Sequence, residues 1–370
     1  MRVAVLGIKT LPAFAGADRV VEQLLAHFSE ENEYSIYLIR DGRPRMCCTD
    51  SRHYVYVPAL RGKHLRAPSY FLLCCLHFLV KGNSEVVHVH NSDFGIFCWL
   101  LKLKRGVRII GTFHGDPATR EKWSRFAKVL LRASEAAFVH ACDTLTSVSP
   151  DKDVARHLVH YIPNGVARQA TSPIDEAQFP YQSLGLTEGE FVMFACGRLD
   201  RTKGLHHLIA AYRDVQSTAR LLVVGDFSHD SRYAQEITDA AVGDDRIVLH
   251  KSLLDEASLI GVLRKCAVFV FPSEIEGMSM MLLEAVMFGR LVICSDIPAN
   301  VAVVGEDYRF LFRSRDVSSL RAALEGALDG EEPNGSVGSL RKRVSETFRW
   351  ERIALEYEAQ YCLRPNAISG

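Results

Sequence analysis

Short apolar runs alternate with amphipathic helical segments along nearly all of this 370-residue chain. Runs of this length, separated by helices, are typical of parallel β-sheets whose two faces are covered by helices. The expected strands are residues 3–6, 35–38, 54–57, 86–89, 107–112, 144–148, 191–196, 220–224, 247–249, 267–271 and 291–294. The alternation therefore predicts an α/β protein built from doubly wound sheets.

The strands fall into two groups, and the chain is long enough for two domains of ordinary size. The segment 167–190 separates the groups and contains two prolines and many polar residues, which is typical of a linker. We expect a first domain over 1–166 and a second over 191–345. The remaining segment, 346–370, is expected to form a last helix with an apolar face.

Composition excludes several classes of protein. Lys and Arg number 44, as do Asp and Glu, so no strong bulk field favours nucleic acid. The ten cysteines contain no C-x-x-C pair and many lie in apolar runs, as reduced core cysteines do. The N-terminus reads as a strand instead of a signal peptide, and the longest apolar run, 70–80, is too short to span a bilayer. We expect a soluble cytoplasmic protein.

Two segments combine basic and apolar residues, 60–79 and 97–108. Such surfaces can hold a protein against anionic lipid, here the inner face of the cytoplasmic membrane. The same composition also fits core helices whose ends are solvated, and the pattern leaves both interpretations open.

A polar loop and an apolar helix follow the strand 267–271. Ser279 is suited to the N-cap of this helix and Gly289 to its end. Glu276 lies in the loop, and Glu284 is the only charged residue of the helix, where an unpaired buried charge is costly. Eight residues are about two helical turns, so both carboxylates can face one side, about 10–12 Å apart. They can bind a ligand, or they can be a cap and a satisfied core residue.

The strand 191–196 runs into Gly197-Arg198, and Lys203-Gly204 then precedes a helix. Two cations beside a helix start favour a diphosphate, because the charges and the helix dipole act together. A surface turn with two solvated bases is the alternative.

Two residues of the first domain could also contact such a ligand. The first strand leads to Gly16 at the start of a helix, without a G-x-G-x-x-G pattern, and a small residue there lets an anion approach the backbone. His114 follows the strand 107–112, at the sheet edge where α/β proteins bind ligands. It could donate a hydrogen bond to a sugar hydroxyl or a phosphate. A plain turn and a structural histidine are the alternatives.

Two patterns that could bind metal have simpler explanations. Asp151-Lys-Asp153 matches D-x-D, but acidic residues in a first helical turn need no metal, and we expect a helix to open there. His88 and His90 share one face of a strand without a third ligand of suitable spacing, so we expect them to pack beneath the strand ends. No metal or other cofactor is therefore expected.

Taken together, these segments resemble the retaining glycosyltransferases of family 4, which have the GT-B architecture. The stretch 271–289 resembles their P-S-x-x-E-G-F-G-x-x-x-L-E-A segment, with Met278 and Ser279 at the Phe and second Gly. Residues 197–204 match their G-R-L-x-x-x-K-G, and 161–166 resembles their I-P-N-G-V. The loop before Gly16 resembles G-G-x-E, with Ala15 and Asp18 as departures. The order of residues over 111–149 is similar to a bacterial, rhamnosyltransferase-like branch.

The resemblance implies two Rossmann-like domains facing a central cleft, the first on the acceptor side and the second binding a nucleotide sugar. It implies that the last helix crosses back to the first domain. The implied reaction moves a sugar, with retention and without metal, from a nucleotide diphosphosugar to a saccharide or lipid-linked glycan. Bacterial surface glycans, lipopolysaccharide among them, are the implied products. UDP-sugars are favoured as donors, and GDP-, ADP- or dTDP-sugars also fit.

The resemblance also assigns residues. The implied catalytic residues are Glu276, His114, Arg198 and Lys203. The implied donor-binding residues are Gly16, Arg198, Lys203, Gly277, Met278, Ser279, Met280 and Glu284. Two other functions stay open, an epimerase of nucleotide sugars with the same architecture and a non-catalytic assembly protein that binds sugar nucleotides.

Overall fold

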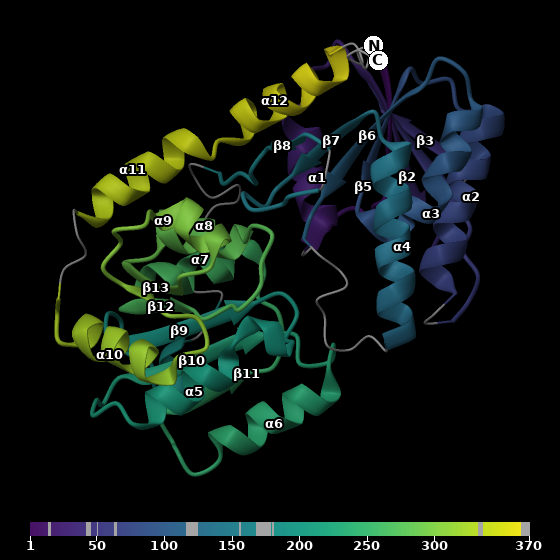
Figure 1. Cartoon of the computed structure of the whole chain (residues 1–370). Helices are drawn as coiled ribbons and strands as arrows, with labels where there is room; N and C mark the ends of the chain where they lie inside the picture. The colour runs from purple at the N-terminus through teal and green to yellow at the C-terminus, as the bar shows by residue number, and fades with distance from the viewer. Residues whose placement is uncertain are drawn as a thin grey trace. The chain divides into compact units, whose positions relative to one another are not determined.

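The computed structural model describes residues 1–13, 16–41, 46–49, 51–62, 65–115, 125–154, 157–167, 179, 181–331 and 336–363; for 46–49 and 94 it describes the backbone alone. The chain forms two compact units, which are described separately (Figure 1). The first consists of Met1–Pro163 together with Trp350–Gly370, and the second of Asn164–Arg349.

The first unit is built on an eight-stranded sheet with the order β3-β4-β2-β1-β5-β6-β7-β8. All neighbours pair in parallel except β3, which is antiparallel to β4. The strands are β1 (Arg2–Leu6), β2 (Glu33–Ile39), β3 (Met46–Thr49), β4 (Arg52–Val57), β5 (Val86–His90), β6 (Arg108–Phe113), β7 (Thr144–Ser147) and β8 (Val159–Tyr161).

Helices cover both faces of this sheet (Figure 1). The chain steps from β1 to β2 in one direction and from β5 to β7 in the other, and right-handed crossovers then place the connecting helices on opposite faces. One face carries α2 (Arg66–Lys81), α3 (Gly95–Cys98) and α4 (Arg125–Ala141), with the 3₁₀ turns η1 (Ser92–Phe94) and η2 (Trp99–Leu103). The other carries α1 (Gly16–His27) and α12 (Trp350–Cys362), which pack together.

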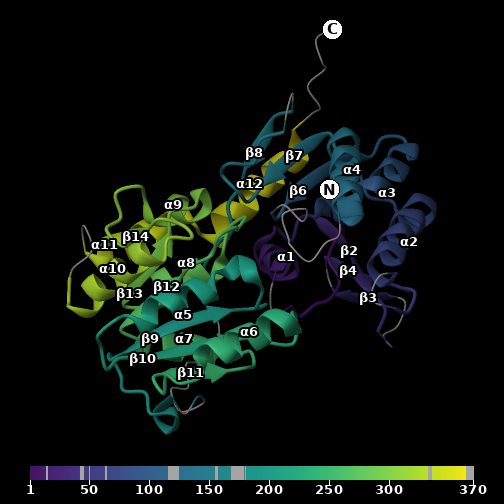
Figure 2. The same cartoon turned by 60° about the horizontal axis from the view of Figure 1, so that its bottom comes forward.

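The second unit is a six-stranded, wholly parallel sheet with the order β11-β10-β9-β12-β13-β14 (Figure 2). Its strands are β9 (Phe191–Cys196), β10 (Arg220–Gly225), β11 (Ile247–His250), β12 (Val268–Phe271), β13 (Leu291–Ser295) and β14 (Leu311–Phe312). β9 and β12 are buried at every position, as expected of central strands covered on both faces.

Its helices also form two layers. One layer contains α5 (Leu205–Arg213), α6 (Ser231–Ala241) and α10 (Val317–Leu328); the other contains α7 (Glu256–Lys265), α8 (Met280–Phe288), α9 (Pro298–Val304) and α11 (Val337–Thr347). The 3₁₀ turns η4 (Tyr181–Leu184) and η5 (Arg201–Lys203) complete it. Side chains of Asp or Ser cap several helix starts by accepting a backbone N–H, which fixes where those helices begin; these residues are Asp230, Asp255, Ser279, Asp316 and Ser336.

The fold confirms the predicted α/β class, and every expected strand is present. The short strands β3, β8 and β14 were not predicted. The helix expected at Asp151 is wrong, because Asp151 lies in a turn and 152–153 are irregular, leading to an isolated bridge between Val154 and His157. The apolar face predicted for the last helix is confirmed, since Trp350 and four more residues of α12 are buried. Among the described helices, none is long and apolar enough to cross a membrane.

Candidate active site

The strand order of the second unit reverses between β9 and β12, which lie side by side. In open α/β sheets this switch point, at the carboxyl ends of the strands, is where ligands bind. The two loops that leave it are 197–204 and 272–279, which carry most of the residues predicted to bind the donor.

The first loop is a capped turn that leads into α5. The Asp200 carboxylate accepts hydrogen bonds from the backbone N–H of Thr202, at 3.1 Å, and from its hydroxyl. Gly204 then takes a left-handed conformation with a φ of +68°, and a Cβ there would lie 2.0 Å from the carbonyl oxygen of Pro272. Only glycine meets both demands, so Gly204 lets the two loops approach each other.

Lys203 and Glu276 form an ion pair across these loops. Lys203 Nζ lies 2.6 Å from Glu276 Oε1, and the two side chains are 22% and 12% exposed. The backbone N–H of Glu274 also donates to the Thr202 carbonyl at 2.8 Å. Burial alone would lower the pKa of Lys203, but the charge of Glu276 and the hydrogen bond to it outweigh burial, so the pKa lies above its ordinary value. Lys203 is therefore a fixed cation at the sheet edge.

Arg198 lies directly beyond β9 with its side chain exposed. The second loop ends at α8, where the Ser279 hydroxyl accepts the Leu282 N–H at 3.4 Å, as predicted for an N-cap. Glu284 lies within α8 and is only 6% exposed. The helix ends at Gly289, as expected, although this glycine has an extended backbone instead of the left-handed one.

Sequence reasoning missed the part played by Asn164. Residues 161–166 stood out only for their resemblance to I-P-N-G-V, but the Asn164 side-chain amide donates to the Met278 carbonyl at 2.9 Å, and its backbone N–H lies 3.1 Å from the Met278 sulfur. Asn164 and Met278 are 114 positions apart in sequence, so no local pattern could reveal the contact. Asn164 thus holds the backbone of the loop before α8.

The first unit has its own switch point, between β1 and β5. Gly7 follows β1 with a φ of +101°, and a Cβ there would lie 1.8 Å from the His90 carbonyl oxygen. The Asp18 carboxylate accepts the N–H groups of Lys9 and Thr10, both at 3.2 Å, which ties the loop after β1 to the first turn of α1. Gly16 opens α1 with a φ of +72° and no atom within 4 Å of a Cβ built there. Ala15 lies outside the described residues.

Three histidines form a hydrogen-bonded and stacked group in the first unit. His114 Nε2 lies 2.9 Å from His90 Nδ1, and the rings of His88 and His90 are 3.9 Å apart. His88 also bonds the Tyr361 hydroxyl of α12, at 2.8 Å. Burial lowers the pKa of His114 to about 4 and that of His88 to about 3, and it takes the pKa of His90 well below its ordinary value. These imidazoles are neutral at pH 7, and His88 and His90 pack as predicted.

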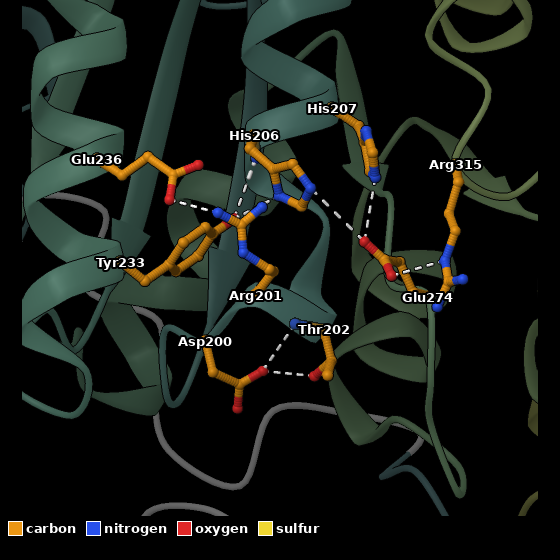
Figure 3. A network of polar contacts seen from close by, with 9 residues as sticks. All are labelled: Asp200, Arg201, Thr202, His206, His207, Tyr233, Glu236, Glu274 and Arg315. Carbon is orange, nitrogen blue, oxygen red and sulfur yellow. Dashed lines mark hydrogen bonds and ion pairs between the residues drawn. The ribbon is translucent and has the colours of Figure 1, made fainter. Parts of the chain in front are cut away.

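A further polar group in the second unit escaped sequence reasoning (Figure 3). Glu274 contacts His207 at 3.1 Å and Arg315 at 2.8 Å, and His206 lies nearby at 3.7 Å. Burial, followed by the charges of His207 and Arg201, lowers the pKa of His206 to about 4. Adjacent histidines at a helix start were the available signal, but nothing local indicated that Glu274, 67 positions from His207, would join them.

In comparisons with known proteins, two glycosyltransferase family models each match one part of the chain. The family model described as Glycosyl transferases group 1 matches residues 179–348, and the one described as Glycosyltransferase Family 4 matches 14–169. The two matches together cover most of both units. The chain therefore joins a region like glycosyltransferase family 4 to a group 1 glycosyltransferase region, as GT-B glycosyltransferases do.

Two of the bacterial relatives align along almost the whole chain. UDP-Gal:alpha-D-GlcNAc-diphosphoundecaprenol alpha-1,3-galactosyltransferase from Escherichia coli is 26% identical, over 94% of this chain and 93% of its own length. Alpha-maltose-1-phosphate synthase from Mycolicibacterium smegmatis is 25% identical, over 96% and 97%. The relatives' names confirm the prediction of a glycosyltransferase enzyme, and they support neither an epimerase nor an assembly protein.

Solved structures agree on the fold. Sucrose-phosphate synthase from Thermosynechococcus elongatus superposes with a TM-score of 0.77 at 20% identity, over 97% of this chain and 98% of its own. HepE from Anabaena, solved with UDP and glucose, gives a TM-score of 0.75 at 14% identity, over 98% and 99%. The predicted architecture of two Rossmann-like sheets is confirmed.

Proposed function

We propose that this GT-B glycosyltransferase moves a sugar, with retention and without a metal ion, from a nucleotide diphosphosugar to a saccharide or lipid-linked glycan. Bacterial surface-glycan biosynthesis is the setting we propose. The observation that carries the proposal is the Lys203–Glu276 pair, 2.6 Å long, at the switch point of the second unit. In such a donor, the fixed cation can bind the anionic diphosphate and the fixed carboxylate can accept hydrogen bonds from the sugar hydroxyls.

In this proposal Lys203 and Arg198 bind the diphosphate. They neutralise it in the ground state and stabilise the charge that develops on the leaving phosphate as the glycosidic bond breaks, usually the largest contribution to catalysis. A diphosphate carries more charge than one carboxylate, so Lys203 turns from Glu276 toward the donor. Glu276 is then released to accept a hydroxyl of the sugar.

The loop before α8 completes the donor site. Backbone N–H groups from Gly277 to Met280 lie at the positive end of the α8 dipole, which favours bound oxygen atoms with negative charge. Ser279 fixes this helix start, and Asn164 fixes the loop through Met278. Glu284 binds the ribose hydroxyls in this proposal. The contributions of Gly16, at the diphosphate, and of His114, at the transferring sugar or β-phosphate, remain predictions.

We propose retention because the family resemblance implies it. In the front-face course that it suggests, the leaving phosphate accepts the proton of the acceptor hydroxyl, so no protein carboxylate has to become a nucleophile. Two cations on the diphosphate take the place of a metal ion. The predicted rhamnosyltransferase-like branch would decide the sugar that is transferred.

The relatives support the proposed class of acceptor. The Escherichia coli galactosyltransferase is named for a UDP-sugar donor and a diphosphoundecaprenol-linked acceptor, and a relative from Staphylococcus aureus is named for capsular polysaccharide biosynthesis. We therefore favour a UDP-sugar donor and a lipid-linked acceptor for this chain. GDP-, ADP- and dTDP-sugars are the alternatives to be screened.

Exposed apolar side chains on the first unit fit a lipid-linked acceptor. Trp99 of η2 is 54% exposed, and Phe126 and Val129, on one face of α4, are 80% and 66% exposed. Lys102 and Lys128 belong to the same two segments. We propose peripheral contact with anionic lipid here, and we expect the wild type to float with phosphatidylglycerol vesicles and Phe126→Asp not to.

The test of the proposed function is a transfer assay in EDTA with a panel of UDP-, GDP-, ADP- and dTDP-sugars and a diphosphate-linked saccharide acceptor. We expect transfer from one class of donor, at the same rate after Mg²⁺ is added. Nuclear magnetic resonance of the product should show the donor's anomeric configuration. Inverted product would contradict retention, transfer that requires Mg²⁺ would contradict the metal-free diphosphate site, and donor turnover without acceptor would favour an epimerase.

A further inference from the structure

Two imidazoles and a carboxylate converge beside the donor loops of the second unit without belonging to the proposed donor site (Figure 3). They come from His206 and His207, at the start of α5, and from Glu274, in the loop after β12. In the part of the chain that the structure describes, they alone form a group of three His, Cys, Asp or Glu residues whose ligand atoms lie within 4.8 Å of one another.

The separations between these atoms suit one small cation. His207 Nε2 lies 3.1 Å from Glu274 Oε1, and His206 Nε2 lies 3.7 Å from the same oxygen. Ligands about 2.0–2.2 Å from zinc at tetrahedral angles are about 3.3 Å apart, so the two measured distances bracket the requirement. The two histidine nitrogens lie within 4.8 Å of each other, so the imidazoles have to rotate toward each other to close the site.

Further contacts hold two of the three ligands, as outer partners do in metal sites. His206 Nδ1 lies 2.8 Å from the Tyr233 hydroxyl, so with the proton on Nδ1 the Nε2 atom becomes a ligand. Glu274 Oε2 accepts from Arg315 at 2.8 Å, which leaves Oε1 on the histidine side. The ligand side chains are 20%, 20% and 10% exposed, so they are held in place and still reachable from solvent.

The net charge of the surrounding residues also favours the binding of a cation. The nine residues drawn in Figure 3 contain three carboxylates and two guanidinium groups, a formal balance of −1 before any ion binds. The Arg201 guanidinium is engaged with Glu236 and the face of Tyr233. A dication at Glu274 Oε1 therefore replaces the contacts of this oxygen with the two histidines. It does not have to displace Arg315, which binds Oε2.

We propose that His206, His207 and Glu274 form a binding site for a divalent transition-metal ion of the zinc class. Two imidazoles and one carboxylate are a donor set that zinc accepts, and three protein ligands leave a coordination position for water. The ion would join the start of α5 to the loop after β12. It would stabilise the junction of the two donor loops without itself contacting the diphosphate, and the site is independent of the proposed reaction.

The test uses the purified full chain, freed of metal by dialysis against a chelator and titrated with Zn²⁺ in competition with a chromogenic chelator. We expect the wild type to bind one zinc ion more than the His206→Gln/His207→Gln double variant. His207→Gln alone should lower the affinity by at least about 100-fold, and Tyr233→Phe, which removes an outer partner, by about 10- to 100-fold. His250→Gln, at a histidine of the same unit that bonds Ser252, should change nothing.

The visible absorption of bound Co²⁺ and the melting temperature provide two further readouts. Co²⁺ should develop the visible absorption of a four-coordinate site in the wild type and not in the double variant. Zn²⁺ should raise the melting temperature of the wild type alone, because it binds only the folded site. Equal zinc affinity in the wild type and the double variant would overturn the proposal, as would a wild type that binds no zinc. A melting-temperature rise with UDP in EDTA shows that the variant is folded, and this rise tests the donor site separately.

Discussion

The two units place polar groups at equivalent points of similar sheets, yet they differ in charge. In the first unit the group is His88, His90 and His114, whose imidazoles are kept neutral by burial. In the second it is the ion pair of Lys203 and Glu276, where the pKa of the lysine is raised. The ion pair of the second unit thus offers fixed charge, and the histidine group of the first offers hydrogen bonds without charge.

This difference fits a division of labour. A diphosphate is favoured by cations, and charged side chains can supply them at neutral pH without a metal ion. Neutral imidazoles can orient hydroxyl groups, but they repel no cation and attract no anion strongly. We therefore expect substitutions at the ion pair of the second unit to change donor binding or sugar transfer. Substitutions in the histidine group of the first unit should change stability in acid.

The largest effect is expected when the charge of Glu276 is removed. Glu276→Gln keeps the shape of the side chain but weakens its contact with the sugar as charge develops, so transfer should fall by about 10²- to 10³-fold. Donor binding should be retained, because Lys203 stays charged. Steady-state kinetics with calorimetry separates the two effects. Glu188→Gln, whose carboxylate pairs with Lys265 and Arg290, is the control. Transfer at the wild-type rate would remove Glu276 from the mechanism.

A smaller effect is expected from Gly204→Ala. The new Cβ has to adopt a left-handed backbone, which costs about 1–2 kcal/mol, and it also meets the Pro272 carbonyl oxygen at 2.0 Å. The second unit should lose about 3 kcal/mol of stability in all, and local hydrogen exchange in α5 and the loop after β12 should quicken. Gly243→Ala is the matched control, because its φ is +85° but nothing lies within 4 Å of its Cβ. Equal losses of stability in the two variants would show that a Cβ at position 204 does not clash with the Pro272 carbonyl oxygen.

The smallest effect concerns acid stability of the first unit. Its histidines titrate near pH 6.5 when unfolded, but the pKa is about 4 for folded His114 and about 3 for His88. The unfolded chain therefore binds more protons, and stability is complete above about pH 6.5 and is lost as the pH falls toward 4. Each such histidine contributes a slope of up to about 1.4 kcal/mol per pH unit.

Tryptophan fluorescence can report this slope selectively, because Trp99, Trp123 and Trp350 all belong to the first unit. Urea unfolding followed at several pH values should show His114→Asn with the shallower dependence. His140→Asn, whose imidazole bonds the Ala136 carbonyl on exposed α4, should keep the wild-type slope. Identical slopes in all three proteins would mean that burial does not keep His114 neutral.

Sequence patterns predicted the architecture because its central strands are uniformly buried and read as continuous apolar runs. They also predicted α8, since Ser279 and Gly289 carry local signals for its ends. The short strands β3, β8 and β14 have too few residues for a periodic signal. The helix expected after Asp151 failed because acidic residues after a proline favour a turn as readily as a helix start.

Residues of the candidate site could be predicted only where a single sequence segment contains a recognisable pattern. Lys203, Glu276 and Glu284 lie in segments with family-like spacing, so they could be singled out. Two contacts depend on how the sheet order brings distant loops together. They are the hydrogen bond from Asn164 to Met278 and the contact of Glu274 with His206. Contacts of this kind arise from topology, and a single sequence contains no periodicity that reports them.

Calorimetry of UDP binding in EDTA and in Mg²⁺, for the wild type, Lys203→Gln and Lys265→Gln, tests whether Lys203 binds the diphosphate without a metal ion. Lys265 also forms an ion pair, 3.0 Å from Glu188, and thus controls for the loss of a lysine charge. We predict wild-type binding of equal strength in EDTA and Mg²⁺, at least about a tenfold loss in Lys203→Gln from a missing charged hydrogen bond, and no change in Lys265→Gln. Binding that appears only with Mg²⁺, or that is unchanged in Lys203→Gln, would contradict the account.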